Sequence, residues 1–231
     1  RTNGCYYNGV SNWQEVCNAG LVLSAIATGD LIPGKKEAIL QEYRRSIIGI
    51  MDNYDPDGAY PEGPGYWGYG TDFGAILGHQ LRLSGIRPYE SDGFLKTGTY
   101  SLHAQGPTGL MANYCDGGAK PSFNVGQFYF ASLGRNCSLL LNELKAVADG
   151  NMNSRLLPAA LILAAGLDVS APSHPEELSF AAVGERPVFF ARTSWDDPLA
   201  GWVSFNGGQA SCPHGHMDGG NFIYEWGGVR W

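Results

Sequence analysis

The feature that most constrains the fold is a change in the spacing of apolar residues near residue 172. Before it, apolar side chains recur every three or four residues, as between residues 35 and 54, and this spacing predicts amphipathic helices. After it come short aromatic and β-branched runs separated by Gly or Asp, which predict strands. We therefore expect an α+β protein, with a helical domain over residues 1–172, a linker at residues 171–175 and a sheet domain over residues 173–231.

Helices are predicted around Ala19 to Ile26 and over residues 35–54, 72–83, 125–133, 137–147 and 154–165. Two long segments rich in Gly and aromatic residues, 55–70 and 98–122, are expected to be loops, where functional residues tend to lie. Strands are predicted at residues 188–192, 201–205 and 221–231, with a hairpin turn at Gly227-Gly228. Because three strands alone do not bury an apolar face, we expect the natural protein to continue beyond Trp231.

Composition narrows the class of partner. Of the 231 residues, 44% are hydrophobic and 16% charged, which is typical of a globular chain, and no apolar run reaches the ~20 residues of a membrane span. The net charge of −7 argues against nucleic acid as the main partner but permits an acidic sugar held by a local group of cations. The five scattered cysteines, which form no Cys-x-x-Cys pair, are predicted to be buried thiols: Cys5, Cys17, Cys115, Cys137 and Cys212.

The segment with the most specific pattern is His-x-His-x-Asp, formed by His214, His216 and Asp218 just before a predicted strand. In an extended backbone, alternate side chains share one face, so the three could act as metal ligands or as a catalytic cluster. A polar, Gly-rich loop without chemistry is the alternative reading.

Two further segments contain candidates. Residues 57–70 combine two carboxylates with Tyr60, Tyr66, Trp67 and Tyr69, whose rings either stack on a ligand or close the top of a helical bundle. At the first helix, Asn12 and Glu15 are polar groups at the helix mouth, although helix capping alone also explains them.

Taken together, Asn12-Trp13, the Asp-Gly…Glu-Gly…Tyr segment, Arg192 with Trp195, and the His-x-His-x-Asp segment resemble the heparinase II/III-like polysaccharide lyases. The resemblance spans nearly the whole chain and implies an incomplete (α/α) toroid followed by the first strands of an antiparallel β-sandwich. It also implies β-elimination of a uronate-containing polysaccharide such as heparin, heparan sulfate or alginate, by a periplasmic or secreted enzyme. Two departures are Trp13, where the family often has His, and Pro64-Gly65-Tyr66-Trp67 in place of Ser-x-x-Tyr-His.

By resemblance, Asn12 neutralises the uronate carboxylate and Glu15 contacts the substrate. Tyr66 or Tyr69 is the acid, and often also the base, while His214 is a base or a second neutralising group. The other substrate contacts that the resemblance implies are Glu62, Trp67 and Arg192.

The resemblance further implies a structural zinc ion bound by His216, with its usual Asp partner on the strand after Trp231. Asp218 is a substitute ligand, although in the family it more often makes hydrogen bonds around the site.

Two other functions stay open. An (α/α)-barrel glycoside hydrolase would need two carboxylates across the scissile bond, drawn from Asp57, Glu62, Asp72 and Asp116. A non-catalytic carbohydrate-binding protein would use the aromatic segments alone. The sequence leaves open whether the protein forms a homodimer.

Overall fold

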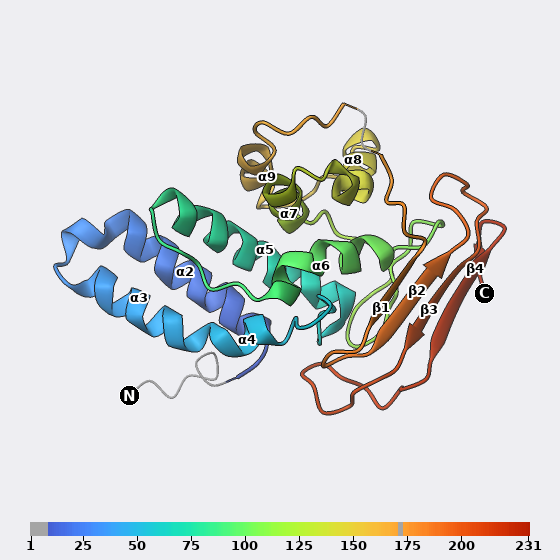
Figure 1. The fold of residues 1–231 in the computed structure, drawn as a ribbon, viewed down its shortest axis with the longest axis horizontal. Coiled ribbons are helices and arrows are strands. Elements are labelled where there is room, and N and C mark those ends of the chain that lie inside the picture. The colour runs from blue at the N-terminus through green and yellow to red at the C-terminus, as the bar shows by residue number, and fades with distance from the viewer. Residues whose placement is uncertain (1–8, 171–172) are drawn as a thin grey trace.

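The computed structural model describes residues 9–170 and 173–231, and helices make up its first part (Figure 1). The α-helices are α2 (Asn12–Thr28), α3 (Lys35–Ser46), α4 (Ile48–Asp52), α5 (Gly63–Leu83), α6 (Asp92–His103), α7 (Gly126–Gly134), α8 (Leu141–Ala148) and α9 (Leu157–Leu163), with short 3₁₀ turns at Gly29–Leu31 and Cys137–Leu140. Within the described ranges, no helix is long and apolar enough to cross a membrane.

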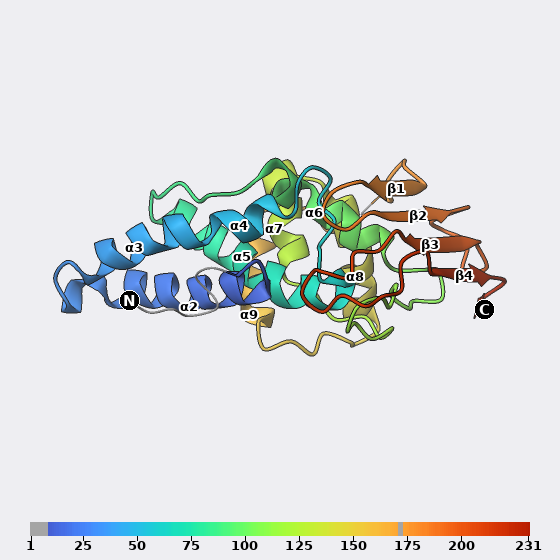
Figure 2. The same ribbon diagram turned by 90° about the horizontal axis from the view of Figure 1, so that it is seen from below.

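A single antiparallel sheet follows the helices, with strands β1 (Ser179–Ala182), β2 (Val188–Arg192), β3 (Trp202–Asn206), β4 (Phe222–Trp226) and β5 (Val229–Arg230) in chain order. Figure 2 shows β1 to β4 as neighbours in this order beside the helices. The α+β class and the order of helices before strands are confirmed. The hairpin turn predicted at Gly227-Gly228 is confirmed, since it joins β4 to β5. The expectation of three strands is wrong, because β1 was not predicted.

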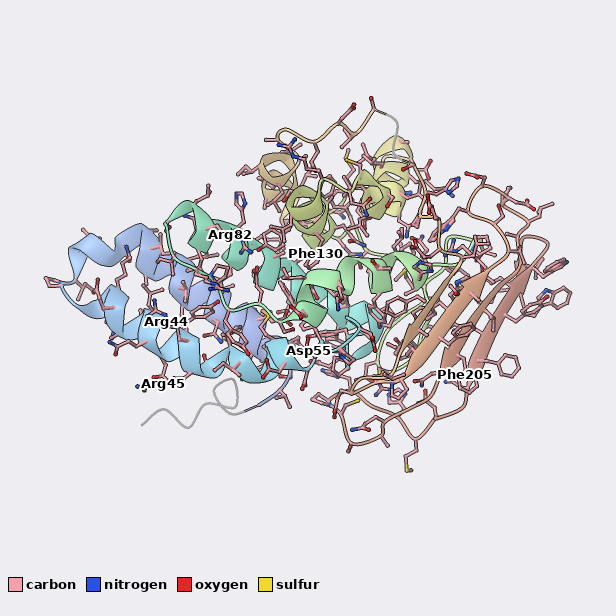
Figure 3. The ribbon with its side chains drawn as sticks, viewed as in Figure 1. Arg44, Arg45, Asp55, Arg82, Phe130 and Phe205 are labelled. Atoms are coloured by element: carbon pink, nitrogen blue, oxygen red, sulfur yellow. The ribbon has the colours of Figure 1, made fainter. Side chains whose placement is uncertain are left out.

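The sheet buries one face against the helices. Phe190 and Trp202 stack at a centroid distance of 6.2 Å, the Tyr100 ring of α6 packs on Phe190, and the Trp202 indole donates to the carbonyl of His103 (3.2 Å). The strands were expected to leave an apolar face uncovered, and in the structure α6 packs on that face. On the other face Phe205 is exposed (Figure 3).

The expected loop at residues 55–70 is wrong in its second half, because α5 begins at Gly63. Glu62 is the residue before the helix and Pro64 lies in its first turn, where its missing N–H leaves no donor unpaired. The many glycines lower the helix propensity but suit the packing: a Cβ at Gly70 would collide with the Glu15 carboxylate of α2. The contact between α5 and α2 therefore outweighs the low helix propensity of these glycines.

Helix α6 was not predicted at all, although Ser91 caps it by accepting a hydrogen bond from the backbone N–H of Phe94 (3.1 Å). Its glycines and threonines hid the apolar spacing. The predicted helix over residues 35–54 is instead two helices that meet at Ile47, and the one over 154–165 shortens to α9. Two residues of the predicted linker, Ala171 and Pro172, lie outside the described residues. Cys5, one of the five cysteines predicted to be buried, also lies outside them.

Candidate active site

His214 lies in the loop between β3 and β4, and a carboxylate from a distant loop holds it. Its Nδ1 lies 2.7 Å from Oδ2 of Asp116, which follows α6 in the chain. The other carboxylate oxygen of Asp116 lies 2.7 Å from Nε2 of His216. These two hydrogen bonds, with that of His214 the larger cause, lower the pKa of Asp116. One carboxylate therefore orients both histidines of the His-x-His segment.

The backbone between β3 and β4 is not the extended segment that the alternation argument required. His214 has a φ of 58°, a left-handed conformation that is uncommon outside glycine. The Asp218 carboxylate consequently binds the side-chain amides of Asn206 (3.3 Å) and Asn221 (3.0 Å), away from Asp116. His214 and His216 thus face one carboxylate, that of Asp116, whereas the Asp218 carboxylate binds Asn206 and Asn221 instead.

Tyr66, in the first turn of α5, stacks on His214 with ring centroids 3.8 Å apart and planes inclined by 12°. The close approach of the Asp116 loop to this helix depends on small residues. A Cβ at Gly65 would lie 2.9 Å from the Cα of Gly117. The beginning of α5 and the loop that contains Asp116 thus meet at the His214 ring.

Glu62 contacts the other ring nitrogen of His214, Nε2. Its Oε2 lies 3.4 Å from Nε2 of His214 and accepts a hydrogen bond from the side-chain amide of Asn12 (2.6 Å), while its Oε1 accepts the backbone N–H of Asn12 (2.5 Å). Burial is the main cause that raises the pKa of Glu62, against the opposing effect of these hydrogen bonds. The amide oxygen of Asn12 is buried and has no hydrogen-bond partner among the residues that the structure describes.

Behind Glu62 lies a second buried carboxyl group, Glu15 of α2. The hydroxyl groups of Tyr54 (2.7 Å) and Tyr60 (2.9 Å) donate to its two oxygens. Burial raises the pKa of Glu15 to about 8, although the two tyrosine hydrogen bonds work in the opposite direction. At neutral pH Glu15 is therefore mostly protonated, which limits the negative charge beside Glu62.

The group that we call the His214 cluster consists of Asn12, Glu15, Tyr60, Glu62, Tyr66, Asp116, His214 and His216. Its members differ in access to solvent. The side chains of His214, His216 and Asp116 are 28%, 51% and 47% exposed, whereas Asn12, Glu15 and Glu62 are buried. The accessible groups can thus meet a ligand directly, and the buried ones set their charge and position.

Three predicted site residues lie elsewhere. Trp67 is fully buried and donates its indole N–H to Thr97 (2.7 Å), so it is a core residue. Arg192 donates to the carbonyl of Gln105 (2.6 Å) and lies over the ring of Trp195, which confirms contact within the Arg-x-x-Trp pair but not a place in the cluster. Tyr69 is exposed and packs on Phe73.

Tyr69 lines a cavity of about 1030 Å³, together with Gly65 and Gly68 of the same helix. None of the residues of the His214 cluster lines this cavity. Three cationic side chains, Lys120, Lys145 and Arg155, also line it. So do two buried carboxyl groups, and burial raises the pKa of Asp72 to about 7 and that of Glu143 to about 8. Within the described part of the chain, Oε2 of Glu143 has no hydrogen-bond partner.

The resemblance implies a structural zinc ion, and the residues expected to bind it have other partners here: His216 binds Asp116, and Asp218 binds two asparagines. Within residues 9–170 and 173–231, no group of three or more His, Cys, Asp or Glu side chains is arranged to hold a metal ion. Zinc binding through His216 stays a prediction.

Two residues of interest were missed from the sequence. Asp116 was considered only as a hydrolase carboxylate, and it lies 98 positions from His214, so no local spacing links them. Glu143 lies in the first turn of α8, where an acidic residue ordinarily has a purely electrostatic explanation. No family model matches this sequence, and no curated protein matches it either.

Proposed function

We propose that the protein is a polysaccharide lyase that cleaves a uronate-containing polysaccharide by β-elimination. The observation that carries the proposal is the His214 cluster: a tyrosine ring stacked on a histidine whose Nδ1 is held by a carboxylate. β-Elimination needs a base for the C5 proton, an acid for the leaving O4 oxygen and groups that stabilise the charge on the uronate. The cluster contains a candidate for each role.

His214 is the proposed base. In the neutral tautomer that donates Nδ1–H to Asp116, the lone pair lies on Nε2. Nε2 lies 3.4 Å from Oε2 of Glu62 and forms no hydrogen bond with any residue that the structure describes. Asp116 then fixes the ring orientation and stabilises the imidazolium formed when Nε2 takes the C5 proton, as a carboxylate does behind a catalytic histidine in other enzymes.

Tyr66 is the proposed acid. A phenol, with an ordinary pKa of about 10, keeps its proton at neutral pH and can pass it to a departing sugar oxygen. The stack holds the Tyr66 ring nearly parallel to the imidazole, and both groups are proposed to face the substrate. Tyr69, the other candidate, packs on Phe73 and is proposed only to line the cavity.

The buried carboxyl groups are proposed to limit the negative charge beside the uronate, because the raised pKa of Glu62 and of Glu15 favours their protonated forms. The Asn12 side-chain amide donates to Glu62. In this proposal Asn12 acts through Glu62 and not by direct contact, since it is buried.

The neighbouring cavity suits an acidic oligosaccharide. Its volume of about 1030 Å³ exceeds what one sugar requires, and Lys120, Lys145 and Arg155 offer cations for carboxylate or sulfate groups despite the net charge of −7. Since such polysaccharides occur outside the cytoplasm, we propose a periplasmic or secreted location.

The test is incubation with heparin, heparan sulfate, chondroitin sulfate and alginate, followed by ultraviolet absorbance of unsaturated uronate. We expect product from at least one substrate, loss of turnover in Tyr66→Phe, and an unchanged kcat in Tyr69→Phe, a matched change one helical turn away. Absence of absorbance with all four substrates, or equal effects of the two substitutions, contradicts the proposal.

A second function, glycoside hydrolysis, is favoured by Asp72 and Glu143. Both line the cavity and have a raised pKa, the property of a general acid at neutral pH. Mass spectrometry separates the two reactions, because products of hydrolysis contain one more water molecule than products of elimination.

The finer architecture is also a proposal: an incomplete (α/α) toroid and a β-sandwich. The outer face of the sheet supports the sandwich, since the paired residues Phe205 and Phe222 are both exposed. A crystal structure of the protein as isolated from its source tests this. Strands must cover both side chains, and a structure that leaves them in solvent excludes the sandwich.

A further inference from the structure

Two cysteines that are far apart in the sequence meet beside the His214 cluster. Cys115, in the loop after α6, and Cys212, in the loop after β3, both direct their sulfur atoms at the carbonyl oxygen of Pro61, at 3.9 and 3.3 Å. Because both sulfur atoms lie this close to one oxygen atom, their separation is at most the sum of the two distances. A disulfide bond is about 2.05 Å long, so one or both cysteine side chains must rotate for the bond to form.

A buried cation lies against the same oxygen. Arg186 is fully buried, donates from Nε to the Pro61 carbonyl (2.6 Å) and directs Nη2 at the sulfur of Cys212. Its other hydrogen bonds run to the side chain of Asn206 (3.3 Å) and the carbonyl of Gln209 (2.8 Å). None of these partners is a carboxylate, so a thiolate at Cys212 would meet an uncompensated guanidinium, the setting in which cysteines react.

The two cysteines also flank the cluster in sequence. Cys115 immediately precedes Asp116, and Cys212 lies two residues before His214. Both loops contain a non-glycine residue in the left-handed region, Cys115 at a φ of 56° and His214 at 58°. Such conformations persist where the surroundings hold them, and a covalent link between the loops would do so.

We propose that Cys115 and Cys212 form a disulfide bond that joins the loop of Asp116 to the loop of His214. The oxidant is a small-molecule disulfide. The Cys212 thiolate attacks one of its sulfur atoms and releases one small thiol, and the Cys115 sulfur then attacks the Cys212 sulfur and releases the second. The protein loses two protons and two electrons, and the oxidant is reduced to two thiols.

The order of attack follows from the surroundings. Burial raises the pKa of Cys115 to about 12, whereas Cys212 is partly exposed beside Arg186. Cys212 therefore reacts first with the external disulfide, and Cys115 resolves it. This replaces, for these two residues, the expectation of inert buried thiols, and it holds whether or not the protein is a lyase.

The experiment uses the full chain equilibrated with oxidised glutathione, then denatured and alkylated. We expect two fewer alkylated cysteines and a linked pair of tryptic peptides, 97–135 and 193–230, each of which contains one cysteine. The midpoint of thermal unfolding should rise by roughly 5–15 °C on oxidation. Cys115→Ser and Cys212→Ser should each abolish the link and the rise, and the matched control Cys137→Ser should keep both.

Three results would overturn the proposal: an unchanged thiol count, a link that involves another cysteine, or a glutathione adduct on Cys212 that persists without resolution. Because serine can replace either thiol as a donor to Pro61, circular dichroism should show both variants folded. The readouts are thiols and unfolding temperature, so the result does not depend on the lyase assay.

Discussion

Replacing Glu15 with glutamine should change how the stability of the protein depends on pH. The folded-state pKa of Glu15 is about 8 against an ordinary value of 4.5, so the fold favours the protonated group. Its contribution to stability is fully present below pH 4.5 and is lost as the pH rises toward 8. Each pH unit in this window changes the free energy of unfolding by about 1.4 kcal/mol. Raising the pH from 5 to 7 should therefore lower the free energy of unfolding of the wild-type protein by roughly 3 kcal/mol through Glu15 alone.

Glutamine resembles the protonated carboxyl group in size and can still accept hydrogen bonds from Tyr54 or Tyr60. At pH 5 the Glu15→Gln variant should thus match the wild type within about 1 kcal/mol. Between pH 5 and pH 7 the free energy of unfolding of the variant should rise by roughly 3 kcal/mol relative to that of the wild type, because the variant has no ionisable group at this position. Glu143, a buried carboxyl group that does not appear among the charges acting on Glu15, affects both proteins alike, so the difference between the curves reports Glu15 together with its neighbours Glu62 and Asp72.

Urea unfolding followed by tryptophan fluorescence at pH 5, 6, 7 and 8 measures these curves. Glu37→Gln, the same change at an exposed position of α3, is the control and should leave the pH dependence unchanged. Parallel curves for wild type and Glu15→Gln would refute the reasoning, since they would mean that Glu15 ionises in the folded state as readily as in the unfolded chain.

Three further predictions concern other residues. Asp116→Asn should lower kcat about 10²-fold or more in the absorbance assay, because the amide cannot stabilise the imidazolium of His214, while Asp168→Asn, an exposed control, should leave kcat unchanged. Trp67→Ala should lower the free energy of unfolding in urea by about 3–5 kcal/mol, as expected for a fully buried core ring; a loss below about 1 kcal/mol would contradict its core position. Gly93→Ala should abolish or sharply weaken the thermal unfolding transition seen by circular dichroism, because the added Cβ would collide with the backbone carbonyl of Tyr54; a variant as stable as the wild type would refute this.

The sequence predicted the fold well where apolar spacing was regular and poorly where glycine was frequent. Helix α7 and strands β2 and β3 were expected within one residue of their observed bounds. Helix α5 was shortened and α6 missed because glycine has low helix propensity. In both helices the glycines admit a neighbouring element, as Gly70 admits Glu15 and Gly93 admits Tyr54. Such contacts are made between distant segments, so no local pattern reports them.

The candidate site was predicted in its residue types but not in its pairing. Asn12, Glu62, Tyr66 and His214 were all selected, and the structure brings them together. Asp218 was preferred to Asp116 because it lies in the same short motif as His214. The left-handed backbone at His214 reverses that preference, and backbone geometry of this kind is not visible in spacing.

The sheet explains how three distant segments reach one place. Glu225 of β4 is fully buried, accepts the backbone N–H of Thr108 (3.0 Å) and pairs with Arg230 of β5 (2.5 Å). Arg230 in turn donates to the carbonyls of Leu110 (3.0 Å) and Met111 (2.8 Å). These bonds attach the segment that leads to Asp116 to the same strands whose preceding loop contains His214. The strand that follows the loop of His214 and His216 therefore also anchors the loop of Asp116, so the alignment of these two loops depends on the sheet as much as on the helices. The helical part alone would lack His214, His216 and the anchor of the Asp116 loop.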